Sequence, residues 1–199
     1  NDMFGGGVLD LRPGQWAADT AMALALVDSL TWRQELDEVD FMERLLEWED
    51  EGVYSCTGGC VGIGKTTAEA LARYRQTGDP IASAIQGAFP SNGSLVRIAP
   101  VAIRYWNSKA QLREVAARQS RSTHAAAEAV DACVAFAGIL ADAISGFRRA
   151  KVLGARHVPS SSSVWSIMGA SWKNKRRSGI RSNNNVISSL EAALWCVET

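Results

Sequence analysis

The sequence predicts an all-α fold, organised as a compact multi-helix domain. Apolar residues recur at steps of three and four in several stretches, as they do along the buried face of a helix. No stretch shows a convincing alternation of apolar and polar residues, which is the pattern of a half-buried strand. Breakers such as Gly78-Asp79-Pro80 separate the helical stretches.

The first helix is expected to follow Asp19 and Thr20, which would cap an apolar stretch that ends near Leu30. Because this stretch is apolar nearly all round, we expect the helix to be central and buried. Pro100 predicts a kink or a split in a later helix. The later helices are expected over residues 40–50, 66–74, 95–106, 109–118, 122–146 and 186–197, with loops at 160–163 and 172–185.

Size and charge narrow the possible classes of protein. A chain of 199 residues can bury a core of its own, and we predict a single domain over residues 1–199. Lys plus Arg and Asp plus Glu number 21 each, so no net charge attracts a polyanion and no nucleic-acid partner is expected. The longest apolar run, residues 21–27, is too short to cross a membrane. Without a signal-peptide pattern, we expect a cytoplasmic protein whose four cysteines are reduced.

Residues 59–66 match the phosphate-binding loop pattern Gly-x-x-x-x-Gly-Lys-Ser/Thr. In that interpretation Lys65 would contact terminal phosphates and Thr66 would contact magnesium. The motif requires a buried strand before it and a parallel sheet around it. Residues 52–58 form a poor strand, so a nucleotide triphosphatase is the less favoured alternative to a glycine-rich loop that opens a helix at Lys65.

Several segments together resemble the ADP-ribosylglycohydrolase family, which includes the dinitrogenase reductase-activating glycohydrolases. The segments are residues 5–30, 55–71, 92–102 and 121–133, with a weaker match at 190–195. They occur in the family's order and cover most of the chain. The string Asn-Gly-Ser-Leu-x-Arg-x-Ala-Pro, which begins at Asn92, is the most specific of them.

The resemblance implies an all-α hydrolase that removes ADP-ribose from a protein side chain, often arginine. Its partner would be an ADP-ribosylated protein or ADP-ribose itself. The family uses two magnesium ions, and magnesium prefers oxygen ligands in octahedral geometry. A pair of such ions needs several carboxylates to hold it and to activate water.

The resemblance also assigns roles to residues of this chain. Asp19 would be catalytic and, with Thr20, would bind metal. The substrate-binding residues would be Gly59, Gly62, Gly64, Asn92, Gly93, Ser94 and His124. The turn at Asn92 precedes a predicted helix, whose free N–H groups suit a diphosphate. Ordinary helix caps at Asp19 and Asn92 and a structural His124 remain the alternatives.

The chain departs from the family pattern at three acidic positions. Where the family has Thr-Asp-Asp-Thr, this sequence reads Ala17-Ala18-Asp19-Thr20, and where the family has Asp-Ile-Gly it has Gly62-Ile63-Gly64. The family's C-terminal Asp-x-Asp-Thr block has no counterpart, because the last aspartate is Asp142. We therefore expect a domain incomplete at both ends, with weak or absent hydrolysis. The alternative is a relative without catalysis that binds ADP-ribose or serves a structural role.

Overall fold

The computed structural model describes residues 4–82, 89–155, 161–181 and 183–199. Within these residues there are nine α-helices, one 3-10 helix and two isolated β-bridges, but no sheet, so the all-α prediction is confirmed. The chain divides into two compact units, Asn1–Pro80 and Ile81–Thr199, and each is described by itself. The single domain expected over residues 1–199 stays a prediction.

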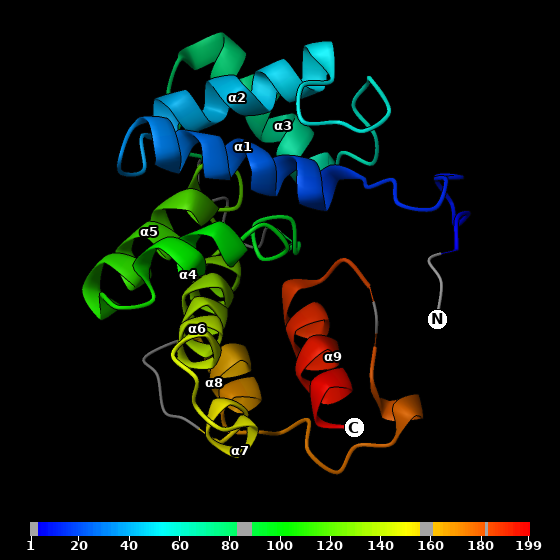
Figure 1. The fold of residues 1–199 in the computed structure, drawn as a ribbon, viewed down its shortest axis with the longest axis vertical. Helices are drawn as coiled ribbons and strands as arrows, with labels where there is room; N and C mark the ends of the chain where they lie inside the picture. The colour runs from blue at the N-terminus through cyan, green and yellow to red at the C-terminus, as the bar shows by residue number, and fades with distance from the viewer. Residues whose placement is uncertain (1–3, 83–88, 156–160, 182) are drawn as a thin grey trace. The chain divides into compact units, whose positions relative to one another are not determined.

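The first unit contains three helices (Figure 1). They are α1 (Ala18–Trp32), α2 (Glu38–Glu51) and α3 (Lys65–Thr77), and α2 packs against both of the others. Phe41, Leu45 and Trp48 of α2 are fully buried, because steps of three and four place them on one face of the helix. The helix begins at an Asp37 cap, whose Oδ1 accepts hydrogen bonds from the N–H groups of residues 39 and 40.

The expectation that α1 is buried all round is wrong. Its buried residues form one stripe, consisting of Ala18, Ala21, Met22, Ala25, Leu26, Ser29 and Leu30. Leu24 and Val27 lie off that stripe and are 36% and 40% exposed. Because apolar residues also occur on the exposed face, the composition of this stretch does not reveal that the helix is amphipathic.

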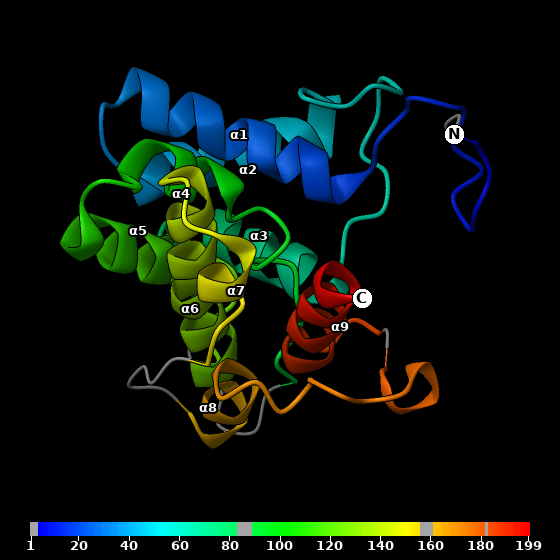
Figure 2. The ribbon, with the colours of Figure 1, turned by 60° about the horizontal axis from the view of Figure 1, so that its bottom comes forward.

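The second unit is organised around one long helix, α6 (Ala127–Ile144), which contacts all the other α-helices of the unit (Figures 1 and 2). Those helices are α4 (Ala99–Tyr105), α5 (Lys109–Arg121), α7 (Arg149–Val152), α8 (Ser162–Met168) and α9 (Val186–Glu198). The buried face of α6 is rich in small residues, among them Ala129, Ala132 and Cys133. Small side chains let neighbouring helices approach closely, which explains how one helix can serve as the centre of the unit.

Three boundaries in this unit differ from those expected. The helix predicted from residue 95 begins at Ala99, because Pro100 fits best in the first helical turn, where its missing N–H is not needed. The helix predicted from residue 122 begins at Ala127. The helix α8 begins at Ser162, inside the serine run predicted as a loop, whose residue 160 lies outside the described residues.

The remaining predicted loop, residues 172–185, contains the short 3-10 helix η1 (Arg177–Gly179), and its residue 182 lies outside the described residues. All four cysteines are free thiols. No helix in the described part of the chain has the length and hydrophobicity needed to span a bilayer.

Candidate functional site

Asp19 and Thr20 lie in the first turn of α1, and both side chains are exposed. The N-cap of α1 is Ala17, without a side-chain hydrogen bond, so the expectation that Asp19 caps this helix is wrong. The protein around the Asp19 carboxyl group displaces enough water to raise its pKa above the ordinary value. The Asp19 carboxyl group lies in the first turn of α1, beside the positive end of the helix dipole.

The glycine-rich loop, residues 52–64 between α2 and α3, is hydrogen-bonded to the residues that precede α1. The indole Nε1 of Trp16 donates to the carbonyl of Tyr54 at 2.9 Å, and the backbone N–H of Trp16 donates to Cys56 Sγ at 3.0 Å. Gly62 has a φ of +78°, and a Cβ added there would lie 3.5 Å from the Cβ of Ala17. The loop thus passes close to the residues immediately before Asp19.

The candidate glycines differ in how strongly the fold requires them. A Cβ at Gly59 or Gly64 would meet nothing within 4 Å, and neither has a positive φ. Gly52, which the sequence analysis passed over, has a φ of +72° and ends α2. A Cβ at Gly52 would lie 2.6 Å from the backbone nitrogen of Gly59. Only Gly62 among the three predicted loop glycines is needed for both conformation and packing.

The structure around residues 59–66 does not support their interpretation as a phosphate-binding loop. Lys65 begins α3 as expected, and its ammonium group lies 3.7 Å from the carboxylate of Glu69 on the same helix. The described residues include no strand before the loop and no sheet around it. A phosphate loop depends on both for its geometry, so the triphosphatase alternative loses its support.

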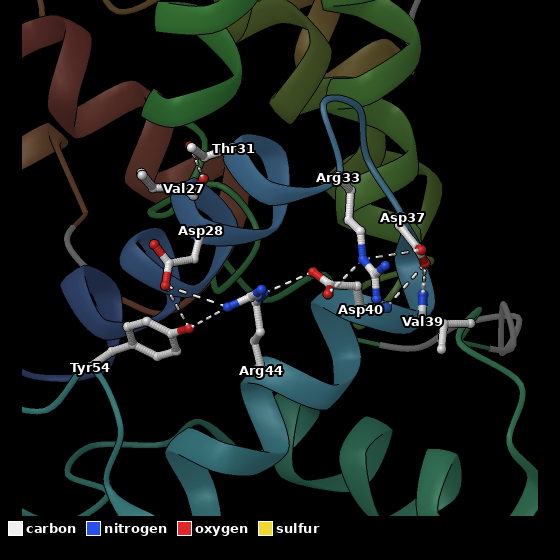
Figure 3. A network of polar contacts seen from close by, with 9 residues as sticks. All are labelled: Val27, Asp28, Thr31, Arg33, Asp37, Val39, Asp40, Arg44 and Tyr54. Carbon is white, nitrogen blue, oxygen red and sulfur yellow. Dashed lines mark hydrogen bonds and ion pairs between the residues drawn. The ribbon is translucent and has the colours of Figure 1, made fainter.

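A polar network fixes the Tyr54 end of the same loop (Figure 3). The Tyr54 hydroxyl donates to Asp28 Oδ2 at 3.1 Å and accepts from Arg44 Nη1 at 2.9 Å. Arg44 Nε also donates to Asp40 Oδ2 at 2.8 Å. Burial raises the pKa of Asp40, but its hydrogen bonds from Arg44 and Arg33 outweigh burial and hold the pKa below its ordinary value.

Replacing Tyr54 with phenylalanine is expected to lower the free energy of unfolding by about 1 kcal/mol, because Arg44 and Asp28 each lose a hydrogen-bond partner. The backbone φ of Tyr54 is +68°, so the side-chain bonds also hold a strained residue in place. Urea unfolding followed by circular dichroism measures the change. Tyr105→Phe is the control, since no hydrogen bond of its hydroxyl is found in the described residues, and an equal loss in both variants would contradict the prediction.

In the second unit, the turn that contains Asn92 and Gly93 is tied to the start of α9. The Asn92 N–H donates to the carbonyl of Asn184 at 2.9 Å, and Asn92 Nδ2 donates to Ser189 Oγ at 2.8 Å. An isolated antiparallel bridge joins Ser91 to Asn185. Since α4 starts only at Ala99, the prediction of a helix N-terminus directly after Ser94 is wrong.

A buried polar cluster lies behind this turn, and sequence reasoning missed most of it. Arg97 is fully buried and donates to Gln119 Oε1 at 2.9 Å and to Thr123 Oγ1 at 2.7 Å. Burial lowers the pKa of Arg97 to about 10, so the guanidinium remains charged at neutral pH. Arg97 lies on the opposite face of the predicted helix from Leu95 and Ile98, so helical periodicity gave no signal for its burial.

The same cluster connects two of the predicted substrate-binding residues, Ser94 and His124. The Ser120 hydroxyl donates to the carbonyl of His124 at 3.0 Å, and its Oγ lies 2.8 Å from Ser94 Oγ. The His124 Nδ1 and Thr123 Oγ1 are 2.7 Å apart. Both Ser94 and His124 are buried, at 0% and 3% exposure, and bond to protein groups.

The stability of the second unit is expected to fall by about 2 kcal/mol between pH 7 and pH 5 because of His124. Burial, aided by the charge of Arg97, lowers the pKa of His124 to about 3. The unfolded chain, with an ordinary histidine pKa of about 6.5, therefore takes up the proton first, and stability is lost as pH falls through this range. Urea unfolding at both pH values measures the loss. His124→Gln should flatten the profile, and an unchanged slope in that variant would refute the assignment.

Comparison with known proteins identifies the family. The family model for ADP-ribosylglycohydrolase matches residues 1–199. The chain belongs to the ADP-ribosylglycohydrolase family.

Individual members of the ADP-ribosylglycohydrolase family match most of the chain. The ADP-ribosylarginine hydrolase Tri1 of Serratia proteamaculans strain 568 is 36% identical over 197 residues, 99% of this chain and 54% of that protein. The ADP-ribosyl-(dinitrogen reductase) glycohydrolase of Rhodospirillum rubrum is 34% identical over 122 residues, 61% of this chain and 39% of that protein. A solved ADP-ribosylglycohydrolase-related protein complex superposes with a TM-score of 0.83 at 32% identity, covering 99% of this chain and 64% of that one. The chain thus spans about half the length of the first of these relatives.

The residues present do not fit a complete two-magnesium site of the kind expected for an ADP-ribosylglycohydrolase. No group of three or more His, Cys, Asp or Glu side chains suited to a metal ion occurs in the described residues. Asp19 contributes one carboxylate and Thr20 one hydroxyl, whereas a magnesium pair requires several oxygen ligands. The metal-binding roles of Asp19 and Thr20 therefore stay a prediction.

Proposed function

We propose that this chain takes part in removing ADP-ribose from the arginine side chain of a modified protein, by hydrolysis of the glycosidic bond. The observation that carries the proposal is the 36% identity with a protein named ADP-ribosylarginine hydrolase, which extends over 99% of this chain. Identity at this level over nearly the whole chain favours a shared substrate class. The free thiols and the lack of a membrane-spanning helix in the described residues agree with a place in the cytoplasm.

Asp19 is the residue we propose for the chemistry. Its carboxyl group is exposed at the start of α1 and has a raised pKa, which suits a group that takes up and releases a proton. Trp16, Tyr54 and Gly62 hold the glycine-rich loop close to the residues before Asp19. That attachment would keep the loop backbone and the carboxyl group in a fixed relation while substrate binds.

We further propose that the 199-residue chain, by itself, hydrolyses slowly or not at all. The reason is the supply of oxygen ligands, because one carboxylate and one hydroxyl cannot hold a pair of magnesium ions. In this proposal the chain can recognise ADP-ribose without a metal, whereas hydrolysis requires the magnesium pair.

The test is the release of ADP-ribose from a peptide with ADP-ribosylated arginine, measured by mass spectrometry with magnesium and with a chelator. The expected result for the chain is release at or near the uncatalysed rate. Any residual release should drop in Asp19→Asn and stay unchanged in Glu35→Gln, which changes an exposed carboxylate between α1 and α2. Fast magnesium-dependent release would support the reaction and reject the proposed impairment.

A second candidate function, a binder of ADP-ribose without catalysis, is favoured by the same shortage of ligands for metal. Calorimetry with free ADP-ribose distinguishes the two. Binding that is equal with and without magnesium, together with no turnover, supports the binder. The absence of any binding would reject both functions for this chain and leave a structural role.

A further inference from the structure

A cavity of about 380 Å³ lies in the second unit, among the end of α4, the first half of α5 and the second half of α6. Its volume falls in the range of about 300–1,000 Å³ that is usual for small-molecule sites. Leu112 and Val134 contribute to an apolar wall, and two aromatic side chains, Trp106 and Phe147, line it as well. The aromatic side chains are 45% and 41% exposed, so a ligand can reach their rings from solvent.

The charged side chains that line the cavity are mainly positive. Lys109 and Arg113 both lie on α5 and face the same space, and neither makes an ion pair within the residues that the structure describes. Asp142 lines the cavity too, so two positive charges and one negative charge leave a net charge of one positive. A ligand with one negative charge would complement this lining, and a carboxylate fits the forked donors of Arg113 especially well.

One residue that lines the cavity is a glycine, Gly138. It lies within α6, where glycine destabilises a helix relative to alanine. A Cβ added there would meet no atom of the described residues within 4 Å, and the residue has no positive φ, so neither the packing nor the backbone conformation seen in those residues requires glycine. Glycine at this position therefore leaves open space in the wall of the cavity.

We propose that this cavity binds a small aromatic carboxylic acid. The ring would lie over Gly138 against Trp106 and the apolar wall, and the carboxylate would pair with Arg113 and Lys109. Lys151 Nζ lies 3.3 Å from the ring centroid of Phe147, which leaves Trp106 as the main stacking surface for a ligand. The site uses residues of the second unit alone, and none of them belongs to the residues predicted to bind ADP-ribose.

The test is calorimetric titration of the full chain with indole-3-acetate, and with uncharged indole for comparison. The expected result is saturable one-to-one binding of the acid with a Kd below about 1 mM, and at least about tenfold weaker binding of indole. Gly138→Leu, which fills the cavity, should weaken binding of the acid by about tenfold or more. Lys109→Ala combined with Arg113→Ala should do the same, and because both side chains are exposed we expect this variant to fold.

Two matched controls make the result specific. Gly138→Ala adds one methyl group and should leave binding largely intact, and Arg176→Ala removes an exposed charge outside the cavity and should leave it unchanged. Circular dichroism checks that each variant is folded, and the charge variant decides the matter if Gly138→Leu does not fold. No saturation by the acid, equal binding by indole, or binding that survives the charge substitutions would overturn the proposal.

Discussion

Replacing Arg97 with alanine is expected to destabilise the second unit by about 3–5 kcal/mol, the largest effect anticipated for a single substitution in this chain. The side chain is fully buried, and its removal leaves a cavity and takes a hydrogen-bond donor away from Gln119 Oε1 and from Thr123 Oγ1. A buried acceptor without a partner loses its hydration without compensation. Urea unfolding followed by circular dichroism measures the loss.

Arg97→Met separates the two contributions to this effect. Methionine fills much of the space but cannot donate hydrogen bonds, so we expect a smaller loss of about 2 kcal/mol. Arg176→Ala removes an exposed arginine from the same unit and should change the free energy of unfolding by no more than about 0.5 kcal/mol. A loss in Arg97→Ala as small as in Arg176→Ala would show that the cluster does not support the fold.

Replacing Gly52 with alanine is expected to destabilise the first unit by about 2–4 kcal/mol and to displace the glycine-rich loop. Its φ of +72° disfavours any residue with a Cβ. The new methyl group would also lie 2.6 Å from the backbone nitrogen of Gly59, which cannot move away as a flexible side chain would. Urea unfolding measures stability, and ADP-ribose titration shows whether the displaced loop still binds.

Gly78→Ala provides a closely matched control for this substitution. Gly78 ends α3 as Gly52 ends α2, with a similar φ of +69°, but a Cβ there would meet nothing within 4 Å. Only the conformational penalty of about 1 kcal/mol should remain in this variant. Equal losses at the two glycines would mean that the contact with the loop backbone is unimportant.

Helical periodicity predicted most of the long helices within a few residues of their observed ends. It succeeded for α2, α3, α5 and α9, where apolar residues recur on one face and polar residues cover the other. It failed for α7 and α8, since helices of four and seven residues are too short for a periodic pattern to emerge. It also failed at the start of α4, where the preference of Pro100 for the first turn overrode the apolar pattern before it.

The candidate site could be predicted only in part, because some of its residues pair with partners that lie far away in the sequence. The resemblance to the family pointed to Asp19 and the glycine-rich loop, because the strings that carry it each lie within a short stretch of sequence. The pairing of Arg97 with Gln119 joins residues 22 positions apart, and Asn92 bonds to Ser189 across 97 positions. No periodicity within one segment encodes such partners, so the buried cluster emerged only from the folded structure.

The attachment of the Asn92 turn to α9 has a consequence for protein synthesis. The turn depends on the carbonyl of Asn184 and the hydroxyl of Ser189, and Val186 donates its N–H to the carbonyl of Pro90 at 2.8 Å. While translation is under way, these partners remain inside the ribosomal tunnel long after Asn92 has emerged. The nascent chain must therefore leave this segment incompletely folded until α9 has emerged from the tunnel, and chaperones can bind the segment during that interval.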